Sequence, residues 1–202
     1  MVLELLKVED RDADFALVEE CRNGDSSAFE ALVRRYKDRV YNVAYRFLGN
    51  HEDAQDVAQE VFVRAYRGID GFKGDSKVYT WLYSIAGNLA RNKLRDSKRK
   101  GRNKGTSLEA LEIQAPGTAQ ALATARETPE ETARRHETEE ALQECLEELP
   151  EHYRIVFVLR TFEQLSYDEI ADSVGCPKGT VKSRLNHARK FLHESLKARS
   201  II

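Results

Sequence analysis

Apolar residues recur at three- and four-residue steps along most of this chain, which is the spacing of one face of an α-helix. In residues 28–48, for example, Leu32, Tyr36, Val40 and Val43 share a face. The same spacing marks residues 12–22, 52–67, 78–99, 129–149, 151–163, 166–174 and 178–199. No stretch of the sequence alternates apolar and polar residues with the period of two that is typical of a strand. The pattern therefore predicts an all-α protein.

Short polar motifs mark the ends of the predicted helices. Ser27 and Glu30 form a capping-box pattern before the 28–48 segment, and Gly49 is placed to end it. Ser166 and Glu169 form a second capping-box pattern. We therefore expect helices to begin next to Ser27 and Ser166.

The chain changes character between residues 101 and 128. This stretch is rich in Gly, Ala, Thr, Ser, Gln and charged residues. It cannot bury enough apolar surface to offset the entropy of ordering it. We predict a flexible, acidic linker that joins two helical domains, residues 12–100 and 129–199.

Composition excludes several classes of protein. The longest apolar run, residues 155–159, is far too short to span a membrane, and the amino-terminal residues lack the pattern of a secretory signal. The three cysteines, Cys21, Cys145 and Cys176, are widely spaced, which suits a reducing compartment and suggests no metal site. We expect a cytoplasmic protein with no membrane insertion, metal or cofactor.

The charge is distributed in blocks. The 202 residues carry 32 basic and 34 acidic side chains, a net charge of −2. Within that total, residues 91–104 carry +7, residues 178–199 carry +6, and residues 105–151 carry −9. The near-neutral total is therefore no argument against a nucleic-acid partner.

Residues 166–185 have the pattern of a helix-turn-helix. Ala171 is small where a second helix must cross closely, and Gly175 follows where the turn needs a positive φ. Val181 and Leu185 then provide the apolar contacts of the second helix. This frame favours major-groove DNA binding over the alternative, an ordinary solvated helix face.

The outer side of the second helix carries side chains suited to DNA. Lysine and arginine neutralise phosphates, while Ser183, Asn186 and His187 are short polar groups able to reach base edges. The predicted DNA-binding residues of this segment are Lys178, Thr180, Lys182, Ser183, Arg184, Asn186, His187, Arg189 and Lys190.

A second basic helix, residues 91–104, follows three aromatic residues, Tyr79, Trp81 and Tyr83. Rings beside a cationic track are typical of single-stranded nucleic-acid sites, where bases stack on the rings. The same rings could equally be core residues beside a solvated helix end, and composition leaves these two interpretations open.

Three segments together resemble a known family. Residues 53–62, residues 70–88, and residues 165–171 together with 179–185 resemble the polymerase-binding segment, region 2 and region 4 of the extracytoplasmic-function (ECF) sigma factors of the sigma-70 family. The resemblance covers about residues 12–99 and 138–196. Within the family, the sequence is similar to the group that contains the envelope-stress sigma factor. It implies two helical domains, without the middle domain of larger sigma factors.

The resemblance implies roles for particular residues. Asp53, Gln55, Asp56, Gln59 and Glu60 would bind the clamp helices of the largest subunit of core RNA polymerase. Region 2 would recognise and melt the minus-ten element, with the loop 72–77 and Asn88 capturing a flipped base. Its predicted DNA-binding residues are Phe72, Lys73, Asp75, Ser76, Lys77, Trp81, Asn88, Arg91, Asn92 and Arg95.

The remaining implied partners concern region 4 and the linker. Region 4 would read the minus-thirty-five element and contact the flap of the second-largest polymerase subunit. His187 stands where many members have Arg, so the preferred bases stay open. The acidic linker would thread the RNA-exit path, either mimicking RNA or acting as a solvated spacer. An anti-sigma factor is expected to control the chain.

Two other classes of protein fit the sequence less well. A helix-turn-helix repressor or activator would need a ligand pocket or a dimerisation helix, and residues 12–99 show neither pattern clearly. An enzyme would need a catalytic motif, and the sequence has no P-loop or nucleophile elbow. The five histidines fall at no metal spacing. We therefore expect no catalytic residue.

Overall fold

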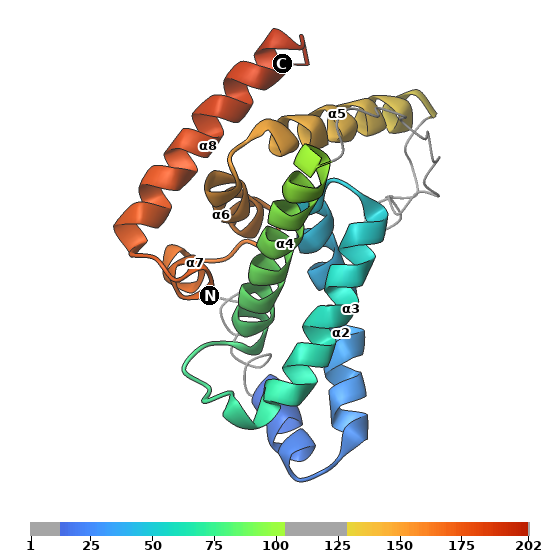
Figure 1. Ribbon diagram of the computed structural model, residues 1–202, viewed down its shortest axis with the longest axis vertical. Helices are drawn as coiled ribbons and strands as arrows, with labels where there is room; N and C mark the ends of the chain where they lie inside the picture. Colours follow the sequence, from blue (N-terminus) through green and yellow to red (C-terminus); the bar gives the residue numbers. More distant parts are fainter. Residues whose placement is uncertain (1–12, 104–128, 202) are drawn as a thin grey trace.

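The computed structural model describes residues 13–103 and 129–201. Its elements are a helix over residues 13–22, α2 (Ser26–Leu48), α3 (His51–Gly68), the 3-10 turn η1 (Ile69–Gly71), α4 (Val78–Asn103), α5 (Pro129–Glu148), α6 (Glu151–Thr161), α7 (Tyr167–Val174) and α8 (Lys178–Ala198) (Figure 1). These residues contain no strand, which confirms the all-α prediction. Most of the predicted linker lies outside the described residues. No helix within the described ranges is long and apolar enough to cross a membrane.

The start of α2 differs from the sequence prediction. Asp25 caps the helix, and its carboxylate accepts the backbone N–H of Ser27 at 2.8 Å. The predicted capping box of Ser27 and Glu30 is therefore wrong, because the carboxylate two residues earlier satisfies the free N–H groups and suits the positive end of the helix dipole. The predicted end is confirmed, since Gly49 adopts φ +83°.

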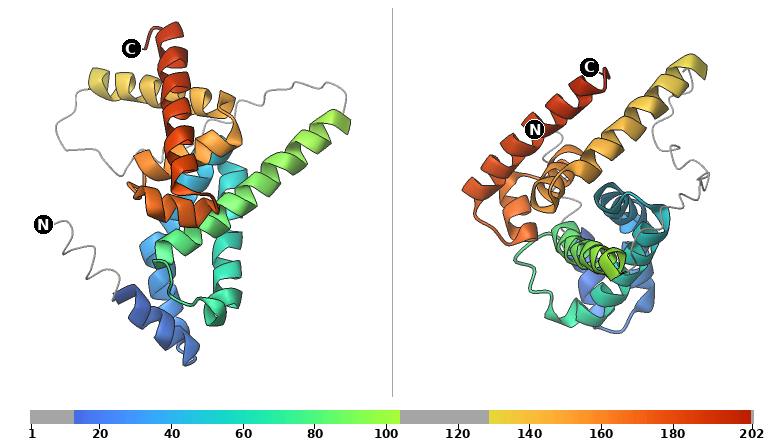
Figure 2. Two further views of the ribbon diagram at one scale, coloured as in Figure 1. Left: turned by 90° about the vertical axis from the view of Figure 1, so that its left-hand side faces the viewer. Right: turned by 45° about the horizontal axis from the view of Figure 1, so that its top comes forward.

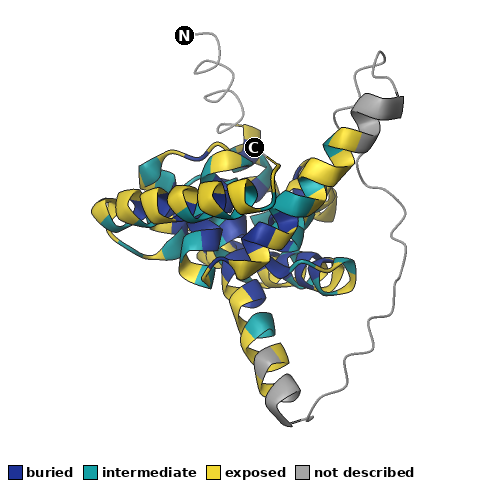
Figure 3. Ribbon diagram, turned by 90° about the horizontal axis from the view of Figure 1, so that it is seen from above, coloured by how far each residue is buried: buried dark blue, intermediate teal, exposed yellow. Residues whose placement is uncertain are grey.

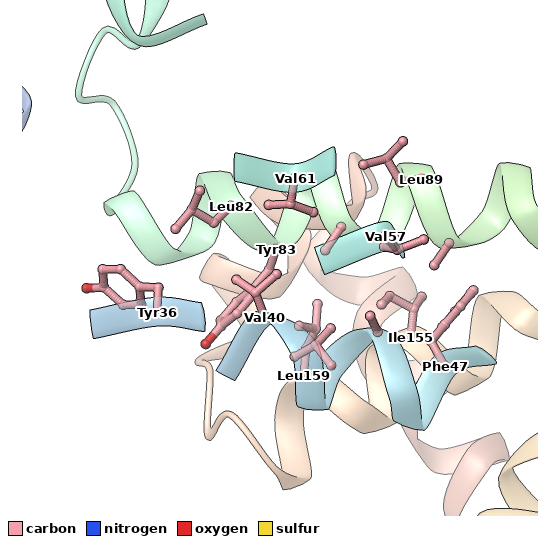
Figure 4. Close-up of a cluster of buried hydrophobic side chains, with 14 of the residues drawn as sticks. Tyr36, Val40, Phe47, Val57, Val61, Leu82, Tyr83, Leu89, Ile155 and Leu159 are labelled. Atoms are coloured by element: carbon pink, nitrogen blue, oxygen red, sulfur yellow. The ribbon is translucent and has the colours of Figure 1, made fainter. Parts of the chain in front are cut away.

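Helices α2, α3 and α4 form the first half of the molecule around one apolar core. Tyr36, Val40 and Phe47 of α2 are buried against Val61 of α3 and Leu82 of α4 (Figure 4). The carboxyl end of α4 leaves this core and projects from the body (Figure 2), where its described residues are largely exposed (Figure 3). Helix α4 thus places a basic, solvated segment beside a rigid helical bundle.

Helices α5 to α8 form the second half. A small cluster, in which Cys145, Leu146 and Leu149 are buried with Ala188 and Leu192, joins α5 to α8. At the far end of α8, Arg199 forms an ion pair with Glu148 at 2.6 Å and another with Glu144. These contacts hold α8 along α5 and leave its other side exposed.

The two halves share a single core, which the sequence analysis did not predict. Ile155 and Leu159 of α6 are buried in the same cluster as Phe47 of α2 and Tyr83 of α4 (Figure 4). Beside them, the guanidinium of Arg154 donates to the backbone oxygen of Phe47. The halves are therefore packed against each other in this structure, whereas the sequence suggested two modules connected only by a tether.

Candidate nucleic-acid and polymerase interfaces

The helix-turn-helix has the local geometry that its sequence predicts. Ser166 accepts the N–H of Glu169 at 3.2 Å, and Glu169 accepts the N–H of Ser166 at 2.8 Å, which completes the capping box. Gly175 ends α7 in the left-handed region at φ +65°. Val181 and Leu185 of α8 are fully buried. The turn and the helix crossing are thus built from the residues singled out in the sequence.

The outer face of α8 is exposed and largely unengaged. Lys182, Asn186 and Arg189 are exposed and form no side-chain hydrogen bond or ion pair with any described residue. Three others are engaged locally: Lys178 with Asp168 at 2.8 Å, Lys190 with Glu194 at 3.9 Å, and the Ser183 hydroxyl with the Thr180 oxygen at 3.0 Å. Arg184 is half-buried. The middle of this face is therefore open to solvent.

His187 has a neighbour that the sequence analysis missed. The ring of Tyr153, at the start of α6, lies 5.6 Å from the His187 ring with an interplanar angle of 26°. His152 lies on Tyr153 as well, at 4.0 Å between ring centroids. The stack restricts the directions that His187 can take on an otherwise open helix. Tyr153 is 34 positions away from His187, so no local pattern could have indicated the contact.

The loop before α4 is held by an aromatic cluster. Phe72 is buried and stacks on Trp81 with 4.8 Å between centroids, and Phe15 lies 5.9 Å from Phe72. Gly74 adopts φ +76°, and a Cβ there would lie 2.0 Å from the Phe15 ring. Only glycine fits this position without displacing the ring. The loop therefore has a defined path.

The predicted minus-ten residues divide into exposed and engaged groups. The exposed group comprises Lys73, Asp75, Asn88, Arg91, Asn92 and Arg95, while Ser76 is half-buried. Phe72 lies in the core and Trp81 is half-buried. Of the two interpretations of the aromatic residues, the core interpretation holds for Tyr83, which is fully buried.

Lys77, also predicted to bind DNA, contacts the second half of the molecule. Its ammonium lies 2.8 Å from Glu169 of α7 and donates to the Tyr79 hydroxyl at 2.9 Å. Tyr79 in turn donates to Glu169 at 2.6 Å. Burial raises the pKa of Glu169, but hydrogen bonds from Lys77, Tyr79 and Ser166 outweigh it and hold that pKa at about 2. Glu169 is therefore a carboxylate at neutral pH.

The predicted polymerase-binding residues lie along one side of α3. Lys93 of α4 bridges two of them, Asp53 at 2.9 Å and Asp56 at 3.0 Å. Gln55 and Gln59 are exposed, and Glu60 pairs with Arg64 at 2.7 Å. An open groove between α3 and α4 is lined by Asp56, Gln59, Glu60, Val63, Arg64, Asn92 and Lys93 among others. Val63 in this groove exposes 42% of its surface, and Tyr66, which packs edge-on against Phe29 of α2, exposes 54%.

Known proteins match both halves. The family model "Sigma-70 region 2" matches residues 32–100, and the model "Sigma-70, region 4" matches residues 139–192. The RNA polymerase sigma-H factor of Pseudomonas aeruginosa is 39% identical over 92% of this chain and 95% of its own length. The ECF RNA polymerase sigma-E factor of Haemophilus influenzae is 38% identical over 91% of this chain and 95% of its own length. The chain belongs to the ECF sigma factors.

A solved structure has a similar arrangement of elements. The structure of CnrH in complex with the cytosolic domain of CnrY matches with a TM-score of 0.64 and 26% identity, over 93% of this sigma factor and 99% of that chain. The region 2 match thus spans most of α2, all of α3 and most of α4, and the region 4 match spans the second half of α5, the helices α6 and α7, and most of α8. Within the described residues no group of His, Cys, Asp and Glu could hold a metal ion.

Proposed function

We propose that this ECF sigma factor binds core RNA polymerase and directs it to promoters that carry a minus-thirty-five and a minus-ten element. The observation that carries the proposal is the presence, in one chain, of an exposed helix-turn-helix face and a basic region 2 helix beside an acidic face. The chain itself performs no chemistry, and the catalytic activity belongs to the polymerase. The sigma factor acts in the cytoplasm, where it meets polymerase and promoter DNA.

Region 4 reads the minus-thirty-five element as a duplex. An α-helix fits the major groove of B-form DNA, where base edges present distinct donor and acceptor patterns. Helix α8 exposes Lys182, Asn186, His187 and Arg189 on one face, so cations can hold phosphates while the shorter polar groups reach bases. His187, held by Tyr153, is the residue we assign to base discrimination.

Region 2 opens and captures the minus-ten element. Flipping a base out of the stack costs a few kcal/mol, which a pocket must offset. Loop 72–77 and Asn88 supply the pocket in this proposal, and Arg91, Asn92 and Arg95 follow the backbone along α4. The exposure of Asn88, Arg91, Asn92 and Arg95 along α4 supports this assignment.

The polymerase contacts involve both regions. The acidic and amide side chains Asp53, Gln55, Asp56, Gln59 and Glu60 bind the clamp helices of the largest subunit. Region 4 contacts the flap of the second-largest subunit. The open groove beside Asp56, with the exposed Val63 at its edge, supports the first contact because it offers apolar area within a polar rim.

An anti-sigma factor regulates the chain in this proposal. The similar CnrH chain was solved with the cytosolic domain of a second protein, CnrY. A soluble domain that holds both regions of this sigma factor would prevent it from joining the polymerase.

Run-off transcription with purified core polymerase tests the function. Promoter-specific transcripts should depend on added sigma factor and should disappear with the variant Asp56→Arg, which places a cation on the clamp-binding face. The matched control is Asp38→Arg, the same substitution at an exposed position of α2 outside the predicted polymerase- and DNA-binding residues. The absence of specific transcripts on any genomic fragment would contradict the proposal.

A further inference from the structure

One surface of region 2 is covered by region 4 and consists of cations and tyrosines. It comprises Arg39 of α2, together with Lys77, Tyr79 and Tyr83 at the start of α4; we call it the cation–tyrosine surface. The guanidinium carbon of Arg39 lies 5.7 Å from the Tyr79 ring centroid and 6.0 Å from that of Tyr83. Such stacking keeps the cation in place among the rings.

Two carboxylates of region 4 occupy this surface. Glu163 accepts from Arg39 Nε at 2.9 Å and from the Tyr83 hydroxyl, and Glu169 accepts from Lys77 and Tyr79 at 2.8 and 2.6 Å. The side chains of Glu163 and Glu169 are only 7% and 19% exposed. Each carboxylate therefore sits in a small site that supplies one cation and one hydroxyl.

The same donors suit phosphate. Carboxylate and phosphate oxygens accept the same charge-assisted hydrogen bonds from guanidinium, ammonium and hydroxyl groups. Tyr79 would also offer a ring to an unpaired base, since stacking on aromatic side chains is the usual complement to backbone contacts in single-strand binding. Lys77 belongs both to this surface and to the loop assigned to the minus-ten element. The cation–tyrosine surface therefore extends the proposed minus-ten site to Arg39 on α2.

The packed arrangement cannot serve a promoter. A compact chain of this length is about 40 Å across. The centres of the minus-ten and minus-thirty-five elements lie about 25 base pairs apart, or ~85 Å along the duplex. Region 2 and region 4 must therefore separate before both elements are bound, and their separation removes Glu163 and Glu169 from the cation–tyrosine surface.

We propose that Arg39, Lys77 and Tyr79 form a phosphate-binding site for the single-stranded minus-ten DNA, and that Glu163 and Glu169 of region 4 fill this site in the free sigma factor. The chain therefore contains its own competitor for promoter DNA. This inference rests on the proposed function and adds a site and a means of control to it.

The test compares binding of a single strand by the full chain and by the variant Glu163→Gln/Glu169→Gln. Glutamine keeps the size of both side chains, and it remains a capping-box residue at position 169, so α7 keeps its cap. The probe is a fluorescein-labelled oligothymidylate of about 12 nucleotides, a length within the range of single-strand sites. Fluorescence anisotropy is measured over a series of salt concentrations, and circular dichroism checks that the variant is folded.

We expect the double variant to bind the probe at least about fivefold more tightly than the native chain at low salt. Two additional phosphate contacts should make the slope of log K against log salt steeper by about 1.4. Adding Arg39→Ala and Lys77→Ala to the double variant should restore the native slope. The single variant Glu169→Gln should give an intermediate slope, and it provides the comparison if the double variant does not fold.

Asp172→Asn is the matched control. It removes one carboxylate from an exposed position of the same helix and leaves the ion pair between Asp168 and Lys178 intact. An equal gain from Asp172→Asn would show a general charge effect and overturn the proposal. So would unchanged binding by the folded glutamate variants, or a gain that survives Arg39→Ala and Lys77→Ala.

Run-off transcription separates this proposal from the function it rests on. If the native chain yields promoter-specific transcripts but the glutamate variants bind the probe no better, the covered site alone is wrong. If the native chain yields no specific transcript, the proposed function itself is wrong.

Discussion

The two proposed nucleic-acid surfaces of this sigma factor differ in how far they are exposed. On α8 of region 4, Lys182, Asn186 and Arg189 are exposed and unengaged by any described residue. In region 2, Phe72 is buried and Lys77 is paired with Glu169. The outer face of α8 in region 4 is already exposed, whereas part of region 2 is exposed only after the contact between the two regions is broken.

The difference follows from the form of DNA that each region meets. A major groove accepts a rigid helix as it is, so nothing is gained by hiding α8. A flipped base requires a pocket that forms around it, and open aromatic and cationic groups would bind any single strand without regard to sequence. Covering region 2 until the chain is engaged limits such binding.

The largest expected effect comes from the core that the two regions share. Leu159 of α6 is fully buried among residues of both regions. Leu159→Ala should lower the free energy of unfolding by about 2–5 kcal/mol, because it leaves a cavity at the contact. Urea denaturation followed by circular dichroism measures this change. Asn186→Ala, on the exposed face of α8, is the control and should change it by less than about 0.5 kcal/mol. Equal effects of the two substitutions would contradict the shared core.

Substitutions in region 2 should have a smaller effect, and they should distinguish promoter binding from promoter opening. Asn88→Ala and Trp81→Ala should reduce promoter opening more than formation of the closed complex, since the flipped base loses its pocket. Permanganate reactivity of melted thymines reports opening, and a mobility shift at low temperature reports closed-complex binding. Equal losses in both assays would show that Asn88 and Trp81 do not capture the flipped base.

Base reading by region 4 should respond to Tyr153 as well as to His187. His187→Ala should lower the discrimination between minus-thirty-five sequences at its base pair by about 1–3 kcal/mol, the usual cost of one mismatch. Tyr153→Leu should cause part of this loss, whereas Tyr153→Phe keeps the ring and should cause none. Binding titrations against duplexes that differ at one base pair measure this discrimination. A uniform loss over all sequences would assign His187 to the DNA backbone instead.

The last prediction concerns the dependence of stability on pH through Glu169. Its pKa is about 2 in the folded chain, below the ordinary value of 4.5. The contribution of this carboxylate to stability is therefore fully present above about pH 4.5 and is lost as the pH falls toward 2. Thermal unfolding between pH 2 and 7 should show this loss in the native chain and not in Glu169→Gln. An identical pH profile in the two proteins would contradict the burial of a paired carboxylate at α7.

Local features of the fold were predictable from the sequence, because they depend on neighbours. The capping box of Ser166 and Glu169, the turn at Gly175 and the buried Val181 all follow from short-range geometry. The cap at Asp25 was not predicted because Ser27 and Glu30 offer a competing capping motif at the start of α2. Asp25 precedes that motif and lies outside the apolar pattern.

Long-range contacts were not predictable from one sequence. Arg39 and Glu163 are 124 positions apart, and Tyr79 and Glu169 are 90 apart. Each of these residues is an ordinary solvated side chain in its own helical pattern, and only the packing of α6 and α7 on region 2 brings them together. The aromatic residues before α4 were ambiguous for the same reason, because Tyr83 is buried by residues of region 4 as well as by its own domain.

The central claim is that the regions are closed in the free chain and separate on a promoter. Pulsed electron paramagnetic resonance tests it with spin labels on cysteines introduced at Arg67 of α3 and His193 of α8, two exposed positions, after replacement of Cys21, Cys145 and Cys176. We predict one narrow distance in the free chain and a longer distance by tens of Å in the complex with core polymerase and promoter, whose elements lie ~85 Å apart. A broad, long distribution in the free chain, or the same short distance in the promoter complex, would contradict the account.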